Sequence, residues 1–234
     1  MPINSIIRND EFFHHYQPIY DIQNWKVVGY EGLFRTEGLS TPEITFDIAK
    51  RKKKLYELDS RSIHKASLTY LKAGYSDRYR NLFLNVFPST ITNPKFHTFI
   101  DQIINDNEFK SQQLIFEINE NEDVKFDILK KSISHLKNLG FLIAIDDFGK
   151  GYSSIKSIVE LQPDFIKLDR FFIEDLRNSE QKKDLIRYLL HFCHKFNSKL
   201  IAEGVEDNES LAILKSLGVQ YAQGFLLGRP ALLS

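Results

Sequence analysis

The chain has almost no cysteine and no long apolar run, and each absence excludes a class of protein. Cys193 is the only cysteine among 234 residues, so neither an internal disulfide nor a cysteine-based zinc site can form. No run of about 18 or more apolar residues occurs, as a membrane-spanning helix would need. The stretch MPINSIIRNDEFFHHY at the N-terminus also lacks the apolar core of a signal peptide. We therefore expect a cytoplasmic protein with no membrane partner.

An excess of charge of either sign is also missing. Lys and Arg together number 31, and so do Asp and Glu, which gives a net charge of zero. This balance argues against a dedicated nucleic-acid-binding protein, so we expect no DNA or RNA partner. The one basic block is KRKKK at residues 50–54. It is either a solvated turn of helix or an electrostatic funnel for a phosphate ligand.

Short apolar stretches rich in β-branched residues alternate with segments of helical periodicity. This alternation predicts a parallel sheet covered by helices. Eight strands favour a (β/α)8 barrel of the TIM type, forming one domain over residues 1–234, and a doubly wound open sheet is the main alternative. Asn93 and Pro94 are typical of a helix start. We expect strands at residues 14–20, 26–34, 81–86, 113–119, 140–146, 164–169, 199–205 and 219–227. We expect helices near residues 55–74, 94–107, 122–138, shortly after 152, 179–197 and 207–217.

Acidic and amide residues stand near the C-terminal ends of most of these strands. In (β/α)8 barrels this end of the strands forms the active-site face. Side chains alternate between the two faces of a strand, so counting by twos selects one inward-facing polar residue from each of several strands. The residues selected are Glu31, Asn85, Glu117 and Asp146. These hard oxygen ligands suit Mg²⁺, Mn²⁺ or Ca²⁺ better than zinc.

A second carboxylate directly follows Asp146. Two adjacent carboxylates repel each other unless they face water or share cations. Asp147 and Glu203 are therefore candidates for a second cation, and such pairs of metals, about 3.5–4 Å apart, typically clamp a phosphate ester. Lys167 lies within an apolar strand, where an unpaired ammonium is costly. We expect it to be held by carboxylates or to meet a phosphate.

Eight motifs then follow one another along the chain, namely YQPIY, YEGLFR, LFLNV, FEINE, IDDFGKGYSS, FIKLD, AEGVED and QGFLLGRP. In this order and spacing the chain resembles EAL domains, which are bacterial phosphodiesterases of cyclic di-GMP. The resemblance extends from about Tyr16 to Pro230. The motif that names the family stands here as Glu31-Gly32-Leu33, with glycine where alanine is usual. The resemblance implies a barrel whose first strand runs opposite to the others.

The resemblance also implies a cofactor and a set of catalytic residues. The cofactor is a pair of divalent cations, Mg²⁺ or Mn²⁺, with Asp147 on the second ion. Lys167 corresponds to the lysine that orients the water and neutralises developing charge. Glu203 corresponds to the glutamate that holds or deprotonates that water. The metal ligands carried over from the family are Glu31, Asn85, Glu117, Asp146 and Asp147, and Glu31 is counted as catalytic as well.

Other positions match residues that contact the substrate or support the site. Arg35 matches the arginine that meets a substrate phosphate. Glu120 matches a glutamate that anchors the loop at 148–154, a loop that often carries a dimer contact, so a homodimer is implied. The resemblance does not indicate which protein partner, if any, this chain binds. The positions that match substrate-binding residues are Gln17, Arg35, Asp59, Glu206 and Gln223.

The leading hypothesis is a metal-dependent phosphodiesterase that opens cyclic di-GMP to linear pGpG. The chain departs from the family pattern at Asn119, where threonine is usual, and at Lys150, where a small residue is usual. These departures favour an alternative hypothesis, a receptor that binds cyclic di-GMP without turnover. A third hypothesis is a scaffold for protein partners with a vestigial pocket.

Overall fold

The computed structural model describes residues 3–37, 41–75, 80–106, 111–119, 122, 124–149 and 154–233. Within them, eight strands close into a barrel in the order of the sequence, from β1 beside β2 round to β8 beside β1. Strand β1 is antiparallel to both neighbours, and the other strands run parallel. The closed barrel confirms the predicted fold and excludes the open sheet. The strands are β1 Phe12–Asp21, β2 Lys26–Thr36, β3 Asn81–Val86, β4 Leu114–Ile118, β5 Leu142–Phe148, β6 Phe165–Leu168, β7 Lys199–Ala202 and β8 Tyr221–Ala222.

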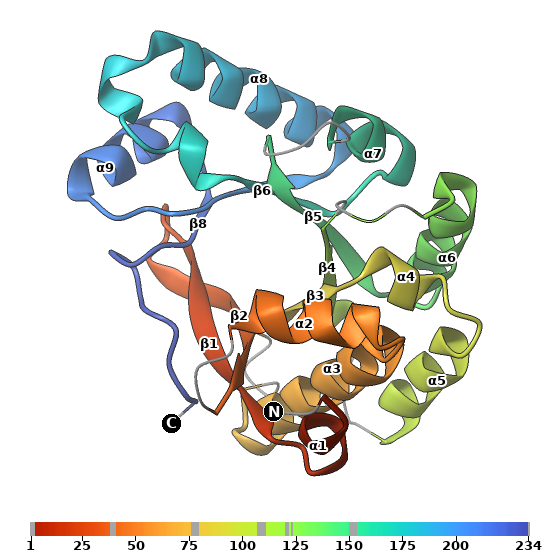
Figure 1. The fold of residues 1–234 in the computed structure, drawn as a ribbon. Coiled ribbons are helices and arrows are strands. Elements are labelled where there is room, and N and C mark those ends of the chain that lie inside the picture. The colour runs from red at the N-terminus through yellow and green to blue at the C-terminus, as the bar shows by residue number, and fades with distance from the viewer. Residues whose placement is uncertain are drawn as a thin grey trace.

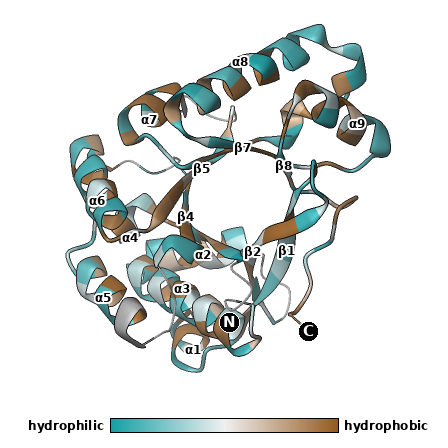
Figure 2. Cartoon of the chain, turned by 180° about the vertical axis from the view of Figure 1, so that it is seen from behind, coloured by the Kyte–Doolittle hydropathy of each residue, from teal (hydrophilic) through white to brown (hydrophobic). Residues whose placement is uncertain are grey.

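Helices surround the barrel, and the view in Figure 1 looks into it. Figure 2 shows hydrophobic and hydrophilic segments alternating along these helices, as expected of helices with one face against a sheet. The helices are α1 Ile3–Arg8, α2 Pro42–Arg51, α3 Leu55–Lys72, α4 Pro88–Ile91, α5 Phe96–Asp106, α6 Phe126–Asn138, α7 Ser154–Leu161, α8 Glu180–Phe196 and α9 Asn208–Leu217.

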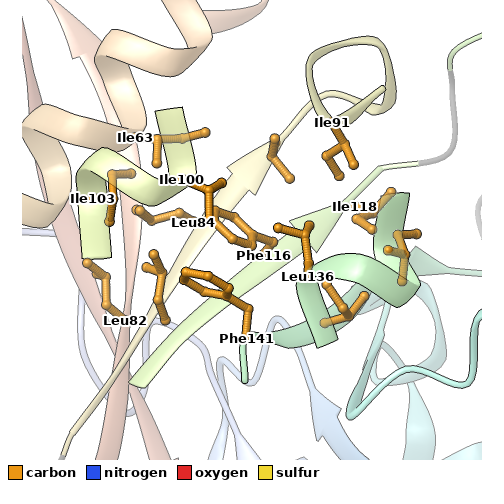
Figure 3. Packing of buried hydrophobic residues seen from close by; sticks show 14 of the residues in the cluster. Ile63, Leu82, Leu84, Ile91, Ile100, Ile103, Phe116, Ile118, Leu136 and Phe141 are labelled. Carbon is orange, nitrogen blue, oxygen red and sulfur yellow. The ribbon is translucent and has the colours of Figure 1, made fainter. Parts of the chain in front are cut away.

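The apolar core has separate layers inside and outside the barrel. Outside it, Leu84 and Phe116 belong to a large cluster between the strands and the helices α3, α5 and α6 (Figure 3). Inside it, a smaller cluster fills the barrel below the strand ends. The inner cluster consists of Ile19, Phe83, Ile115, Ala144, Phe165 and Ile201. Because this layer fills the interior, only the two mouths of the barrel are open to ligands.

A β-bulge corrects the predicted alternation along β2. The pairing with β1 shifts so that Ile19 faces Gly29 while Tyr20 faces Val27, which leaves Val28 as the extra residue. Val28 therefore packs against the inner cluster. Counting back by twos from Glu31 along β2 predicts Val27 at this inward-facing position. Glu31 lies beyond the bulge, so its predicted inward direction is unaffected.

The predicted last strand, 219–227, is wrong in length. Strand β8 ends at Ala222, because the following segment packs against Val205 instead of continuing the ladder. Val205 donates its N–H to the carbonyl of Gln223, and its own carbonyl accepts from Leu226. A Cβ on Gly224 would lie 2.1 Å from the Val205 oxygen, so glycine is needed for this close approach.

The start of α5 and the presence of α2 differ from the prediction. Helix α5 begins at Phe96, two residues after the expected start, and the Asn93 side chain accepts a hydrogen bond from the N–H of Lys95. Helix α2 was not predicted, although Thr41 caps it by accepting from the N–H of Ile44 and proline follows the cap.

The basic block at 50–54 lies at the end of α2 and the start of the next helix. Lys50 forms an ion pair with Glu122, with 3.0 Å between the charged atoms, and Lys54 pairs with Glu57. Both outer lysines of the block are therefore compensated, which favours the solvated helix turn over the funnel. No helix among the described residues is both long enough and apolar enough to cross a bilayer.

Candidate active site

A ring of polar side chains lies at one mouth of the barrel, where the parallel strands end. Every strand or the residue just after it contributes, as the sequence analysis predicted for most of them. The side chains are linked to one another by hydrogen bonds and ion pairs. The ring consists of Gln17, Glu31, Asn85, Glu117, Asp146, Asp147, Lys167, Glu203 and Gln223.

Lys167 is the centre of the ring. Its side chain is only 1% exposed, and its ammonium lies within 3.5 Å of four carboxylates, three on strands and the fourth directly after β7. The sequence predicted that carboxylates would hold this lysine, and the structure brings them together. From Nζ the distances are 2.7 Å to Glu117 Oε1, 2.9 Å to Glu203 Oε1, 3.1 Å to Asp146 Oδ1 and 3.5 Å to Glu31 Oε1.

Burial and mutual repulsion shift the pKa values of this cluster. Burial raises the pKa of Glu117 well above its ordinary value, and the nearby charge of Glu31 adds to the shift. Burial likewise raises the pKa of Glu203 to about 8. For Lys167, burial opposes the charged form, but the surrounding carboxylates outweigh it and raise the pKa well above its ordinary value. Lys167 is therefore a permanent cation in this site.

Amide side chains fix the carboxylates of the ring. Asn85 donates from Nδ2 to Glu31 at 3.2 Å and to Glu117 at 3.3 Å. Gln223 donates from Nε2 to the other oxygen of Glu31 at 2.7 Å and to Gln17 Oε1 at 3.1 Å. Gln17 in turn donates to the carbonyl of Gly228. Glu31 is thus held by an amide on each side.

The backbone at Asp147 explains how two consecutive carboxylates reach the same site. In a regular strand, neighbouring side chains point to opposite faces. Asp147 has a left-handed backbone with a φ of 53°, and the register of β5 against β6 is irregular between Ile145 and Phe148. One oxygen from each of Asp146, Asp147 and Glu203 therefore lies within 4.8 Å of the others. Asn119 also donates to Asp147, at 3.3 Å.

The chemistry of this donor set fits divalent cations. Four carboxylates surround a single ammonium, and Asp147 adds another negative charge beside them. Carboxylate and amide oxygens are the ligands that Mg²⁺ and Mn²⁺ favour. Gln223 also has a buried oxygen, Oε1, without a hydrogen-bond donor among the described residues. The arrangement can hold cations and present charge and hydrogen bonds to a phosphate group.

The remaining predicted site residues contact other groups than Lys167. Arg35 is four residues beyond Glu31 on β2 and donates to the carbonyl of Phe34. Asp59 is buried in α3 and accepts from the N–H of Phe87, so it supports the loop after β3. Glu206 is bound by Arg170 at 2.7 Å. Glu120, the predicted loop anchor, lies outside the described residues.

Arg170 and Asn119 were missed as parts of the site. Arg170 holds Glu206 and also contacts Glu174. Its position depends on a short 3₁₀ turn after β6, which has no periodicity in the sequence. Asn119 was noted only as a departure from a motif, and its place directly after β4 was the available signal.

Comparison with known proteins agrees with this geometry. The family model described as the EAL domain matches residues 3–230. The chain belongs to the EAL family. The fold and the resemblance predicted from the motifs are therefore both confirmed.

Curated relatives of this EAL domain include proteins named as cyclic di-GMP phosphodiesterases. A probable cyclic di-GMP phosphodiesterase of Escherichia coli K12, PdeB, is 27% identical over 97% of this chain and 44% of its own length. The cyclic di-GMP phosphodiesterase NbdA of Pseudomonas aeruginosa is 29% identical over 97% of this chain and 30% of its own length. The chain thus spans less than half the length of these relatives.

Solved structures of EAL proteins have the same fold. The PaMucR phosphodiesterase in complex with c-di-GMP superimposes with a TM-score of 0.85 at 26% identity, over 98% of this chain and 95% of that one. The Klebsiella pneumoniae BlrP1 structure with manganese and c-di-GMP, determined at pH 6, has a TM-score of 0.87 at 27% identity, over 96% of this chain and 57% of that one.

Proposed function

We propose that this EAL domain is a cyclic di-GMP phosphodiesterase that opens its substrate to linear pGpG with the help of two divalent cations, Mg²⁺ or Mn²⁺. The observation that carries the proposal is the buried Lys167 with four carboxylates around it at the strand ends. A purely structural ion pair needs one carboxylate, whereas this cluster places four around one ammonium, and divalent cations would compensate the negative charge of the four when they ionise.

The carboxylates and the asparagine divide into two groups of proposed cation ligands. The first ion would be held by Glu31, Asn85, Glu117 and Asp146. The second ion would be held by Asp147 together with Asp146. Bound there, the cations would act as Lewis acids that polarise the phosphodiester and neutralise its negative charge. The structural support is the 4.8 Å grouping of oxygens from Asp146, Asp147 and Glu203.

The residues of the chain then have distinct roles in the proposed reaction. Lys167 donates hydrogen bonds and stabilises negative charge as the phosphorus–oxygen bond breaks. Glu203 accepts a proton from the attacking water, and its only ion pair in the described structure is with Lys167. Gln17 and Gln223 hold Glu31 in place and present amide groups to the substrate. Arg35 lies farther along β2, where its guanidinium would meet a phosphate of the bound nucleotide.

Product identification tests the proposal directly. Purified protein is incubated with cyclic di-GMP and either Mg²⁺ or Mn²⁺, and the nucleotides are separated by chromatography and identified by mass spectrometry. We expect pGpG, and no product in the presence of a chelator. The matched variant Glu117→Gln keeps the side-chain shape but removes a carboxyl group that can ionise and bind a cation. Intact substrate with the wild-type protein and both metals would refute the proposal.

One contact favours the alternative of a receptor without turnover. The donation from Asn119 to Asp147 engages a carboxylate that the second cation needs. Tight binding of cyclic di-GMP without product after long incubation would support this alternative. The variant Asn119→Thr would then restore turnover.

The proposal also covers the domain organisation, the assembly and the location of the molecule. We propose that the 234 residues form a single domain, that it pairs with a second copy and that it works in the cytoplasm. Sedimentation with and without nucleotide measures the pairing, and a single unfolding transition is the result expected of one domain.

A further inference from the structure

The mouth of the barrel opposite the carboxylate ring has a cavity of about 320 Å³. It lies where the parallel strands begin, because Lys26, Asn81, Phe165 and Lys199 are the first residues of β2, β3, β6 and β7. Pockets that bind small molecules start at about 300 Å³, so the cavity is large enough for a compact ligand. Its lining consists of Ile19, Lys26, Val27, Val28, Arg80, Asn81, Phe83, Phe165, Lys199, Ile201 and Tyr221.

The charges in this lining are all positive. Lys26, Arg80 and Lys199 contribute three cations, and the described lining includes no acidic residue. Burial raises the pKa of the Tyr221 hydroxyl, and Asp21 lies close enough to this lining for its negative charge to add to the shift. Burial acts to raise the pKa of the Asp21 carboxyl as well, but hydrogen bonds from neighbouring amides and backbone N–H groups outweigh burial and lower that pKa. Asp21 pairs in register with Lys26, so the described surroundings of this mouth hold three cations and one nearby carboxylate.

Aromatic rings form part of the floor under these cations. The ammonium of Lys199 lies 5.2 Å from the centre of the Phe165 ring and 5.8 Å from that of Tyr221. Arg80 is held in place by Tyr30, whose hydroxyl accepts from Nη1 at 3.3 Å. The apolar part of the lining thus includes rings set edge to face, with Phe165 inclined at 74° to Phe83 and at 68° to Tyr221. An apolar floor under a cationic rim suits a ring that carries an anionic group.

The inner apolar cluster separates this cavity from the carboxylate ring. Phe83 and Ile201 are at most 1% exposed and lie between the two mouths. Along β7, Lys199 and Glu203 are four residues apart, which corresponds to about 13 Å in an extended strand. A ligand at one mouth does not touch the other.

We propose that this N-terminal mouth is a second binding site, for a phosphorylated ring compound of mononucleotide size. Three cations match the double negative charge of a phosphate monoester better than the single charge of a carboxylate. The apolar floor receives the ring, and the rim of Lys26, Arg80 and Lys199 receives the phosphate. This proposal does not depend on hydrolysis at the opposite mouth.

Methyl-labelled NMR of the full chain in EDTA tests the site, with adenosine 5′-monophosphate as the probe. Saturable shifts are expected at the methyl groups of Val28 and Ile201, and not at Leu33, which lies near the carboxylate mouth. Adenosine and inorganic phosphate, titrated separately, are each expected to bind more weakly than the monophosphate. Shifts confined to Leu33, or no saturable shift up to millimolar probe, would overturn the proposal. Equal binding of either fragment would also overturn it.

Substitution at the rim provides an independent test. In the double variant with Arg80→Gln and Lys199→Gln, the probe should bind at least about tenfold more weakly, because charged hydrogen-bond donors are lost. The matched control is Lys195→Gln on α8. That lysine also lies near a ring, 5.7 Å from the centre of Phe196, but outside the cavity. Unchanged affinity in the double variant, or an equal loss in the control, would refute the site.

Discussion

Lys167 and Glu117 form a buried ion pair at the centre of the carboxylate ring, with 2.7 Å between Nζ and Oε1 and at most 1% exposure of either side chain. Burying two charges is costly, and the pair is stable only while both partners are present. The pair therefore links the stability of the barrel to the chemistry proposed at its mouth.

The first prediction concerns loss of the ammonium. Lys167→Met leaves the four carboxylates facing one another without a cation, and breaking a buried pair typically costs about 3–5 kcal/mol. We expect a decrease of this size in the free energy of unfolding, measured by urea titration in EDTA. Lys195→Met, on the exposed face of α8, is the control and should change little. Equal stabilities of the two variants would show that Lys167 does not stabilise the cluster.

The second prediction concerns the number of cations. Asp147 reaches the site through its left-handed backbone and is the carboxylate assigned to the second ion. Asp147→Asn should reduce the number of bound Mn²⁺ ions from two to one, counted from the free-ion EPR signal. Asp184→Asn, which alters an exposed carboxylate on α8, should leave the number unchanged. Two tightly bound ions in the Asp147 variant would contradict the assignment.

The third prediction concerns pH and Asp59. Burial raises the pKa of Asp59 from 3.8 to about 7, although the hydrogen bond from the N–H of Phe87 acts in the opposite direction. The unfolded chain releases this proton near pH 4, while the folded chain keeps it until about pH 7. The folded state binds more protons in this window, so stability falls as pH rises through it and levels off above pH 7.

Asp59→Asn should remove this dependence. Its amide oxygen accepts the same hydrogen bond from Phe87 but does not ionise. At pH 8 the variant should be more stable than the wild type by up to roughly 4 kcal/mol, and at pH 4 the two should be similar. Urea denaturation at several pH values measures both. Parallel stability curves for the two proteins would mean that Asp59 does not titrate in this range.

The sequence predicted the barrel and the ring of strand-end residues because both depend on regular periodicities. Glu31, Asn85 and Glu117 were found by counting along strands of ordinary geometry. Features that depend on irregular backbone were not predicted, such as the bulge at Val28, which decides which residue packs inside the barrel. The left-handed backbone of Asp147 is another example, since aspartate is enriched in this conformation but still adopts it in only a small minority of cases.

Contacts set by tertiary packing were also beyond the sequence. The early end of β8 depends on how closely Gly224 approaches Val205, and these residues belong to segments that are separate in the sequence and follow the neighbouring strands β8 and β7. The pairing of Arg170 with Glu206 depends on a turn with no periodic signal. The cationic mouth was missed for a similar reason, because Lys26, Arg80 and Lys199 come together only when the barrel closes.

The last prediction concerns Gly204, which directly follows the proposed catalytic Glu203. Its φ is +70°, and a Cβ there would lie 2.5 Å from Cγ and 2.6 Å from Cβ of Arg170. Gly218 is the matched control, because its φ is +91° and a Cβ would meet nothing within 4 Å. Alanine at either position adopts an unfavourable left-handed backbone, at a cost of roughly 1–2 kcal/mol.

Gly204→Ala should therefore be less stable than Gly218→Ala, since only the first adds a steric clash to the backbone strain. It should also decrease turnover of cyclic di-GMP, because relief of the clash moves Glu203 or Arg170, whereas the Gly218 variant should retain the wild-type rate. Urea denaturation and initial rates with saturating Mn²⁺ measure the two effects. If the two variants lost the same stability and kept the same rate, the packing of Gly204 against Arg170 would have no part in positioning Glu203.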